Sequence, residues 1–288
     1  MGDDGAMGVA SAIRSRDAEL EAIELELLLE AVYRRYSFDF REYAISSLRR
    51  RLWKRVEEEG LQSISGLQER VLHDPTAMDR LLRDLSVNVT SMFRDPSFYR
   101  SFREHVVPQL RTYPFIRIWN AGCSTGEETW SVAIVLHEAG LLDRVRLYGT
   151  DVNASVLQRA RSGSMSLERV KSYAVDYGQA GGTGDLLDYF DTDGDTCTLR
   201  QDLASSVVFA QHNLVSDRSF NEFHVIMCRN VMIYFGRTLQ DRVHALLHES
   251  LAMFGFLALG RKESIRFTRH EASYQDLDAR EKLYRKVA

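Results

Sequence analysis

The stretch 116–131 constrains the fold of this chain more than any other. It reads Ile-Arg-Ile-Trp-Asn-Ala-Gly-Cys-Ser-Thr-Gly-Glu-Glu-Thr-Trp-Ser. Its apolar start predicts a buried strand over residues 116–120, Gly122 and Gly126 bracket a tight turn, and a helix is expected from Glu127. A strand, a glycine turn and a helix N-terminus together form the front of a nucleotide-type cofactor site in α/β proteins.

The spacing of this turn indicates which ligand fits. The glycines stand as Gly-x-x-x-Gly, so the dinucleotide fingerprint Gly-x-Gly-x-x-Gly is absent, and no Gly-Lys-Ser/Thr marks a phosphate-binding loop. Glu127 and Glu128 would repel a pyrophosphate but suit a cationic, hydroxyl-bearing ligand. S-adenosylmethionine (SAM) fits, since it carries a sulfonium, an ammonium and a ribose diol. The alternative is an ordinary α/β turn whose glutamates favour the helix dipole.

Composition sets the broad class of protein. The 288 residues are 44% hydrophobic and 10% aromatic, as in soluble globular proteins, and the net charge of -4 argues against a mainly nucleic-acid-binding surface. Three cysteines without a Cys-x-x-Cys motif predict a reducing compartment, no disulfide and no metal site. Neither a signal peptide nor an apolar run long enough to span a bilayer is found, so a cytoplasmic location is expected.

The pattern along the chain predicts three parts. Residues 1–17 are expected to be disordered, residues 18–87 to form an N-terminal helical domain, and residues 88–288 to form a second domain. In the second domain strand-like and helical runs alternate, which predicts an α/β fold with a mostly parallel sheet covered by helices. The strand-like runs are 116–120, 146–150, 207–210, 225–228 and 256–259, and the helical runs are 127–139, 154–161 and 238–253. An insertion at about 165–205 is expected to hold a small antiparallel piece, and 282–287 to form a closing edge strand.

A basic cluster lies in the N-terminal helical domain. Ile45, Leu48, Leu52 and Val56 recur at helical spacing and predict a buried stripe. The other faces of this helix carry five cationic side chains, which are Arg49, Arg50, Arg51, Lys54 and Arg55. They form either a solvated helix face or a docking surface for an acidic partner.

Polar residues follow successive predicted strands, where ligand sites of open α/β sheets lie. The second strand ends in Asp151, a position where a carboxylate usually holds a ribose diol. His212-Asn213-Leu214 follows the next strand and is expected to hold an adenine edge, and Cys228-Arg229-Asn230 follows the one after that. In the segment that joins the two domains, Pro96 predicts a helix to about residue 107, with Asp95 as its cap.

Five segments together resemble the signature blocks of the CheR family, which are chemotaxis receptor glutamate O-methyltransferases. They are Asn-Val-Thr-x-x-Phe-Arg-Asp (88–95), Ala-Gly-Cys-Ser-Thr-Gly-Glu-Glu (121–128), Gly-Thr-Asp (149–151), His-Asn-Leu (212–214) and Cys-Arg-Asn-Val-x-Ile-Tyr-Phe (228–235). The resemblance implies a small N-terminal helical domain followed by a SAM-dependent methyltransferase Rossmann-like sheet with a small inserted β subdomain. It also implies methyl transfer from SAM to glutamates of a protein acceptor, with S-adenosylhomocysteine as product and acidic helices of a chemoreceptor cytoplasmic domain as partner.

The resemblance also implies roles for single residues. Arg94 and Tyr234 correspond to the positions that act near the transferred methyl group. The implied cofactor-binding positions are Asn88, Thr90, Arg94, Glu128, Asp151, Asn213, Leu214, Arg229 and Asn230, to which the turn residue Gly122 is added from the pattern above. In the family the basic N-terminal helix faces the receptor, which favours the docking interpretation of residues 49–55.

Two further features bear on function. No general base is needed, because a glutamic acid side chain with a pKa of about 4.3 is already ionised at neutral pH. Where the family pattern ends in Gly-Gly-x-Leu-x-Leu-Gly-x-Ser-Glu, this chain has Phe254-Gly-Phe-Leu-Ala-Leu-Gly-Arg-Lys-Glu263, which predicts a more basic edge at Arg261 and Lys262. The alternative function is a CheR-like SAM-binding signalling module with a non-chemoreceptor acceptor or a regulatory role.

Overall fold

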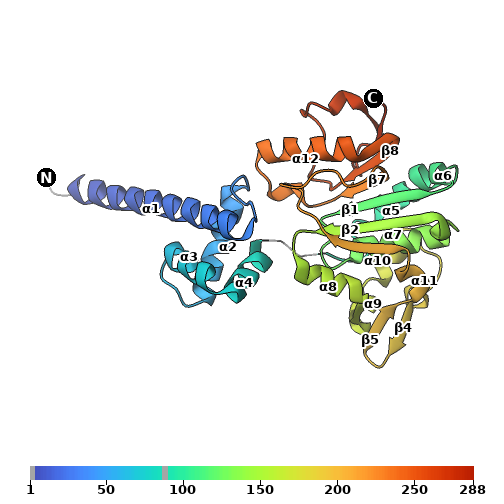
Figure 1. Ribbon diagram of the computed structural model, residues 1–288, viewed down its shortest axis with the longest axis horizontal. Coiled ribbons are helices and arrows are strands. Elements are labelled where there is room, and N and C mark those ends of the chain that lie inside the picture. Colours follow the sequence, from blue (N-terminus) through green and yellow to red (C-terminus); the bar gives the residue numbers. More distant parts are fainter. Residues whose placement is uncertain (1–3, 86–89) are drawn as a thin grey trace. The chain divides into compact units, whose positions relative to one another are not determined.

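The structure is a computed structural model that describes residues 4–85 and 90–288, with side chains described from Ala18 onward (Figure 1). The chain divides into two compact units, Met1–Val87 and Asn88–Ala288. Each unit has a hydrophobic core of its own. Among the described residues, no helix is both long enough and apolar enough to cross a membrane.

The first unit is helical, as the sequence predicts. Its helices are α1 (Asp4–Tyr36), α2 (Ile45–Glu58), α3 (Ile64–His73) and α4 (Pro75–Leu85). Helix α1 already begins at Asp4, where the sequence predicted disorder over residues 1–17. No proline interrupts this stretch, and extending an existing helix costs far less than starting one.

The buried stripe of α2 differs from the predicted one at two positions. Leu48, Leu52 and Val56 are buried in the core of the unit, as expected. Ile45, predicted to be buried, is 67% exposed because it is the first residue of the helix and turns away from the core. Arg51, predicted to lie on the surface, is buried instead.

The second unit contains a seven-stranded sheet with the order β6-β2-β1-β7-β8-β10-β9. The strands from β6 to β8 run parallel, and β10 pairs antiparallel with both β8 and β9, which confirms the mostly parallel sheet. Their bounds are β1 (Ile116–Ala121), β2 (Val145–Asp151), β6 (Val207–Gln211), β7 (Phe223–Cys228), β8 (Leu251–Leu259), β9 (Tyr274–Asp278) and β10 (Leu283–Lys286). The predicted closing edge strand was therefore misplaced, because β9 occupies the edge and β10 lies inside it.

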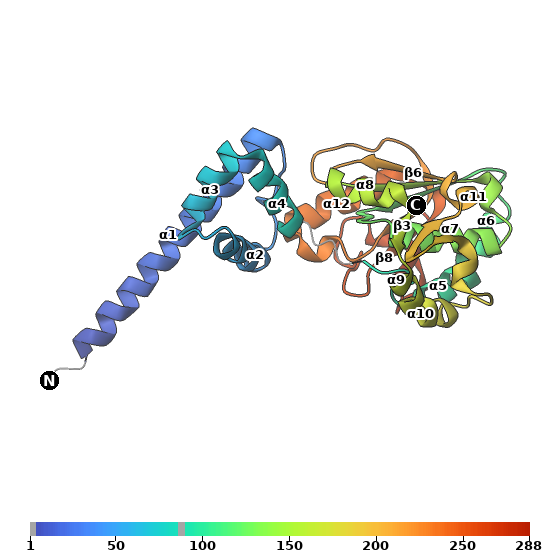
Figure 2. The same cartoon turned by 90° about the horizontal axis from the view of Figure 1, so that it is seen from below.

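Helices connect and cover these strands (Figures 1 and 2). A continuous helical segment precedes β1 and consists of α5 (Pro96–Ser101), the π-helical turn η1 (Phe102–Val106) and α6 (Val107–Leu110). The others are α7 (Glu127–Glu138), α8 (Ala154–Ser162) and α12 (Arg237–Ser250). Helix α12 ends before the predicted residue 253 because Leu251–Leu259 extends as β8 beside β7.

The insertion contains the predicted small antiparallel sheet, together with helices that were not predicted. Its elements are β3 (Ser164–Ser166), α9 (Leu167–Ser172), α10 (Ala174–Gln179), the 3-10 turn η3 (Leu186–Tyr189), β4 (Phe190–Asp193), β5 (Thr196–Leu199) and α11 (Gln201–Ala204). Glu138 at the end of α7 accepts hydrogen bonds from the hydroxyls of Tyr177 and Tyr189 and pairs with Arg103. One carboxylate therefore fixes the insertion to the main sheet and its helices.

Candidate functional site

The glycine turn lies at the carboxyl end of β1, as predicted. Gly122 has a φ of 73° and Gly126 a φ of 92°, both in the left-handed region that favours glycine. The backbone N–H groups of Gly122 and Cys123 each donate to the carbonyl of Thr150 at 2.8 Å. A Cβ on Gly122 would lie 2.5 Å from Cγ2 of Val231, so the turn also needs a glycine for close packing.

Asp151 ends β2 beside this turn and is buried. Its Oδ2 accepts the Ser124 N–H at 3.0 Å, and its Oδ1 accepts the Asn153 N–H at 2.9 Å. Burial raises the pKa of Asp151, although these backbone donors act in the opposite direction. Each carboxylate oxygen has two lone pairs, so Asp151 retains acceptor capacity. The buried Oγ of Ser124 has no hydrogen-bond partner among the described residues, which marks a polar site next to Asp151.

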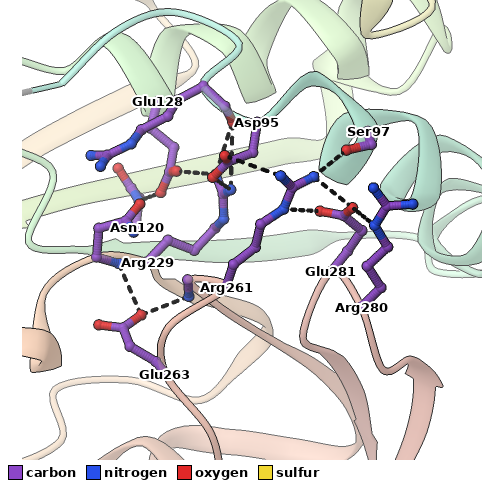
Figure 3. Close-up of polar contacts among 12 residues, drawn as sticks. Asp95, Ser97, Asn120, Glu128, Arg229, Arg261, Glu263, Arg280 and Glu281 are labelled. Atoms are coloured by element: carbon purple, nitrogen blue, oxygen red, sulfur yellow. Dashed lines mark hydrogen bonds and ion pairs between the residues drawn. The ribbon is translucent and has the colours of Figure 1, made fainter.

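A buried ionic network brings together residues from three distant segments (Figure 3). Arg229, after β7, donates from Nη1 to Glu128 Oε2 at 2.6 Å and from Nη2 to Asp95 Oδ2 at 2.9 Å. Glu128 Oε1 accepts the Asn120 side-chain amide at 2.7 Å. Two predicted cofactor residues, Glu128 and Arg229, are thus direct partners of each other.

Asp95 does not cap α5 as the sequence predicted. It occupies the cap position with a φ of 57°, and its side chain makes no capping hydrogen bond. The carboxylate binds Arg229 instead, and it lies 3.7 Å from Arg261. Pairing with a fully buried guanidinium stabilises this carboxylate more than a helix N-terminus would.

The backbone around Arg94 is held in an unusual shape. Phe93 and Asp95, on either side of it, have φ values of 53° and 57°, which non-glycine residues rarely adopt. The Phe93 N–H donates to Ser131 Oγ at 2.9 Å, and both terminal nitrogens of Arg229 lie within 3.5 Å of the Arg94 carbonyl oxygen. Strain retained by surrounding contacts is common at functional sites. Arg94 itself is half-buried.

Glu263 is a site residue to which the sequence analysis gave no role. It follows β8, and its carboxylate accepts the backbone N–H groups of Asn230, Val231 and Met232 at 2.7–2.9 Å. These residues lead into the 3-10 turn η4 (Met232–Tyr234), so Glu263 fixes the turn that carries Tyr234. The signal available in the sequence was an acid just after a buried apolar strand.

The remaining residues that were predicted to contact the cofactor or the methyl group differ in burial and in their hydrogen bonds. Tyr234, Thr90, Leu214 and Asn230 are half-buried, and Asn230 has a φ of 61°. Asn213 closes a turn, since its Oδ1 accepts the Val215 N–H at 2.9 Å. Asn88 lies outside the described residues. Arg94 and Tyr234 each make a further interaction with the protein.

His212, in the segment 212–214 that was predicted to hold an adenine edge, packs among aromatic side chains. It is buried, its ring centroid lies 5.2 Å from that of Trp119, and its Nε2 is 3.1 Å from the Arg218 carbonyl oxygen. The other ring nitrogen, Nδ1, is buried without a hydrogen-bond partner among the described residues, and an adenine contact of this segment stays a prediction.

Most of the five cations that were considered as a docking surface bind carbonyl, hydroxyl or carboxylate groups of the N-terminal unit itself. Buried Arg51 donates to the Leu85 carbonyl at 2.7 Å and to Ser47 Oγ at 2.8 Å. Arg55 pairs with Glu58 and Asp84, Lys54 with Glu58, and Arg49 with Glu21. Exposed Arg50 has no ion pair among the residues that the structure describes. These residues do not form a continuous free basic face, because two of them belong to the interior.

Nucleophilic and metal chemistry find little support in the described residues. The three cysteines are buried, and burial raises the pKa of the Cys123 and Cys228 thiols well above the usual range. No group of three or more His, Cys, Asp or Glu side chains in the described parts of the chain is arranged to hold a metal ion. The chemistry of the site is thus that of carboxylates, arginines and hydroxyls.

Comparison with known proteins gives matches over both units. The family described as CheR methyltransferase, all-alpha domain, matches residues 23–86, and CheR methyltransferase, SAM binding domain, matches residues 88–282. A Pseudomonas putida protein named Cher3 is 44% identical over 92% of this chain and 97% of its own length. The chemotaxis protein methyltransferase Cher2 of the same organism is 27% identical over 78% of this chain and 83% of its own. The chemotaxis protein methyltransferase of Salmonella typhimurium is 33% identical over 62% of each chain.

Proposed function

Because this chain belongs to the CheR methyltransferase family, we propose that it transfers the methyl group of SAM to glutamate side chains of a protein acceptor. The SAM-binding domain and SAM-dependent methylation in chemotaxis are common to the family. The proposed acceptor is the cytoplasmic domain of a chemoreceptor, which presents its glutamates on acidic helices. The products would be a glutamyl methyl ester and S-adenosylhomocysteine, formed in the cytoplasm.

The residues at the strand ends fit SAM. Its ribose diol has two donors for Asp151, whose buried carboxylate has acceptor capacity left and whose neighbour Ser124 has a buried Oγ without a partner in the described chain. Glu128 offers negative charge for the cationic groups of SAM, and Arg229 and Asn120 hold that carboxylate in place. We propose Thr90, Asn213, Leu214 and Asn230 as further contacts. When bound, SAM supplies an electrophilic methyl group.

The proposed reaction is a direct in-line displacement. An ionised oxygen of the acceptor glutamate forms a bond to the methyl carbon while the bond to sulfur breaks, and the electron pair of that bond goes to sulfur. No proton is moved, since the carboxylate is ionised at neutral pH. Catalysis therefore depends on positioning. Arg94 orients the acceptor carboxylate, and Tyr234 contributes its hydroxyl and ring near the sulfonium.

The observation that carries this proposal is the placement of Arg229. It contacts Glu128 of the cofactor turn and, at the same time, the carbonyl of Arg94 and the carboxylate of Asp95. One buried guanidinium thus fixes a proposed cofactor residue and the segment that carries a proposed transfer residue. Preorganisation of this kind is what a reaction driven by positioning requires.

The test is the chemical nature of the product. The purified protein is incubated with tritiated SAM and the cytoplasmic fragment of a chemoreceptor from the same cells, and the labelled fragment is then exposed to mild alkali. A glutamyl ester should release volatile methanol, whereas an N-methyl group survives. Tyr234→Phe and Arg94→Ala should slow labelling, and Arg111→Glu, an exposed change ahead of β1, should not. Alkali-stable label would contradict glutamate methylation, and SAM binding without any transfer would favour a signalling module.

For partner docking we retain only the exposed cations of α2. Arg49, Arg50 and Lys54 are exposed and remain proposed contacts to an acidic helix. Arg51 and Arg55 are assigned to the interior of the N-terminal unit, since their guanidinium groups bind its own carbonyl and carboxylate groups.

A further inference from the structure

A basic pocket lies beside the turn that carries Tyr234, and no role proposed above makes use of it. The cavity has a volume of about 190 Å³. Its walls come from η4, from the first turns of α12 and from the loop after β8. Its cationic lining residues are Arg237, Lys262 and Arg266. We refer to these three residues and the cavity between them as the basic pocket.

The three cations of the basic pocket are free to meet a ligand. Arg237, Lys262 and Arg266 are exposed, and none has an ion pair within the described parts of the chain. Arg261, the neighbour of Lys262, is different, since it pairs with Glu281 at 2.8 Å and contacts Ser97 (Figure 3). Of the two cations predicted to make this edge more basic, Arg261 is therefore neutralised by its ion pair, and Lys262 keeps its charge available.

The other titratable groups lining the cavity do not cancel this charge. Two carboxylates, Asp241 and Glu263, line it, and Glu263 directs its oxygens to the backbone N–H groups of the turn. His244 stays neutral near pH 7, because burial lowers its pKa to about 4. The open side of the basic pocket is thus cationic on a chain whose net charge is -4.

An exposed aromatic residue stands at the rim. Phe267 lines the cavity, is 82% exposed and has a φ of 65°. Its backbone N–H donates to Glu271 Oε2 at 2.7 Å, which holds the loop in this shape. Aromatic residues are common anchors at interfaces, and Phe267 stands directly beside the cationic lining of the cavity.

We propose that the basic pocket binds a carboxylate of the acceptor segment itself, close to the glutamate that is methylated, while Phe267 packs on an apolar side chain of the same segment. This inference rests on the proposed function, and it adds a recognition site for the acceptor segment. Ile233 lines the cavity, and Tyr234 is the next residue on the same turn. On a helix, side chains three or four residues apart have Cβ atoms about 5–6 Å from each other. A suitable acceptor is therefore an acidic helix with carboxylates one turn apart and leucine-like residues between them.

Charge complementarity of this kind sets the register of a bound segment and the rate of encounter. The glutamate to be methylated would be selected partly by the acidic residue one turn away. A segment with a lone glutamate, or with lysine one turn away, would be a poorer substrate.

The experiment measures binding and needs no methyl transfer. The probe is a fluorescein-labelled peptide of repeated Ala-Glu-Glu-Leu units, about 16 residues and so about four helical turns long. Its affinity is measured by fluorescence anisotropy with the full chain at low salt. Lys262→Glu and Arg266→Glu should each weaken binding at least about tenfold, because each replaces an attractive charged contact by a repulsive one. Lys262→Gln and Phe267→Ala should weaken it by smaller factors.

The matched control is Arg111→Glu, which makes the same change of charge on an exposed residue ahead of β1, at the other end of the parallel strands. It should leave the affinity for the peptide unchanged, and SAM affinity measured by calorimetry should be unchanged in all of these variants. Equal peptide affinity in wild type, Lys262→Glu and Arg266→Glu would overturn the proposal, as would failure of the wild type to bind the peptide. Tighter binding of an oligothymidylate of equal length, lost in the same variants, would also overturn it in favour of a nucleic acid.

The two proposals fail in different ways. If the alkali test contradicts glutamate methylation but the peptide still binds at the basic pocket, the proposed function is wrong and the pocket stands. If glutamyl esters form at equal rates with Lys262→Glu and wild type and peptide binding is unchanged, the pocket proposal alone is wrong.

Discussion

The guanidinium of Arg229 lies 2.6 Å from the carboxylate of Glu128, although 101 residues separate them in the chain. The same guanidinium reaches Asp95, 134 residues away, and its Cζ lies 4.0 Å from the centroid of the Phe98 ring. The side chain of Arg229 is buried, so its charge depends on the carboxylates that pair with it. This pairing joins the cofactor turn to the segment of Arg94.

The first prediction follows from this pairing. Arg229→Met leaves Glu128 and Asp95 without their partner in a buried site, which should lower the free energy of unfolding by about 3–5 kcal/mol. Urea denaturation measures this loss. Arg218→Met, at an exposed arginine in the loop after β6, should change stability little. Equal losses in the two variants would show that the network contributes no special stability.

The sequence predicted the sheet because its strands are continuous apolar runs between turn signals. The glycine turn was also predictable, since Gly-x-x-x-Gly between a strand and a helix implies left-handed backbone, and both glycines have positive φ. The strand β9 was missed because Tyr274–Asp278 is polar and lies at the sheet edge, where a strand buries little. Its pairing with β10 depends on tertiary contacts that no local pattern shows.

The errors on α2 have a different cause. Measured from Leu48, the stripe positions of a helix include 51, 52, 55 and 56, so Arg51 and Arg55 lie on or beside the buried face. Residue type alone places both arginines on the surface, which is the basis of that prediction. The partners that allow their burial, such as the carbonyl of Leu85 and the carboxylate of Asp84, come from another helix and could not be inferred from α2.

Glu263 provides the second prediction. Glu263→Gln replaces an acceptor for several N–H groups by a side chain with one acceptor and one donor group, so the turn at 230–233 loses hydrogen bonds. We expect a loss of stability of about 1.5–3 kcal/mol for each charged hydrogen bond left unmade. We also expect slower methyl transfer, because Tyr234 follows this turn. Thermal unfolding and transfer rates measure the two effects, and Glu249→Gln on the exposed face of α12 is the control.

The third prediction separates two reasons why a position requires glycine: a left-handed backbone conformation and close packing against a neighbour. Gly122 and Gly140 have similar φ values, 73° and 68°, but a Cβ meets Val231 at 2.5 Å only at Gly122. Gly140→Ala should therefore show the cost of the backbone alone, about 1–2 kcal/mol. Gly122→Ala should cost more and should also weaken SAM binding, since the turn would move. Adding Val231→Ala to Gly122→Ala should recover part of the loss. Indistinguishable stabilities of the two single variants would exclude the packing argument.

The last prediction concerns the pH dependence of SAM binding. Burial raises the pKa of Asp151 above its usual value, so the carboxylate takes up a proton at a higher pH than an exposed aspartate does. Only the ionised form can accept both hydrogen bonds of a ribose diol. SAM affinity should therefore be full above the raised pKa and should fall as the pH is lowered through it. The stability of the ligand-free protein changes with pH in the opposite direction. The ionised carboxylate of Asp151 is less favourable in the folded than in the unfolded protein. Its contribution to the free energy of unfolding therefore falls as the pH rises from the unfolded-state pKa through the folded-state pKa.

Asp151→Asn provides the control for this prediction. The amide keeps the size of the side chain but cannot titrate, so the pH dependence assigned to Asp151 should disappear. SAM should also bind more weakly by about 1.5–3 kcal/mol at neutral pH, the usual cost of losing a charged hydrogen bond. Titration calorimetry between acid and neutral pH measures both effects, with circular dichroism at each pH to confirm that the protein is folded. If the Asp151→Asn protein binds SAM as tightly as the wild type, the diol contact must be made elsewhere. If its affinity keeps the same dependence on pH, another group is titrating.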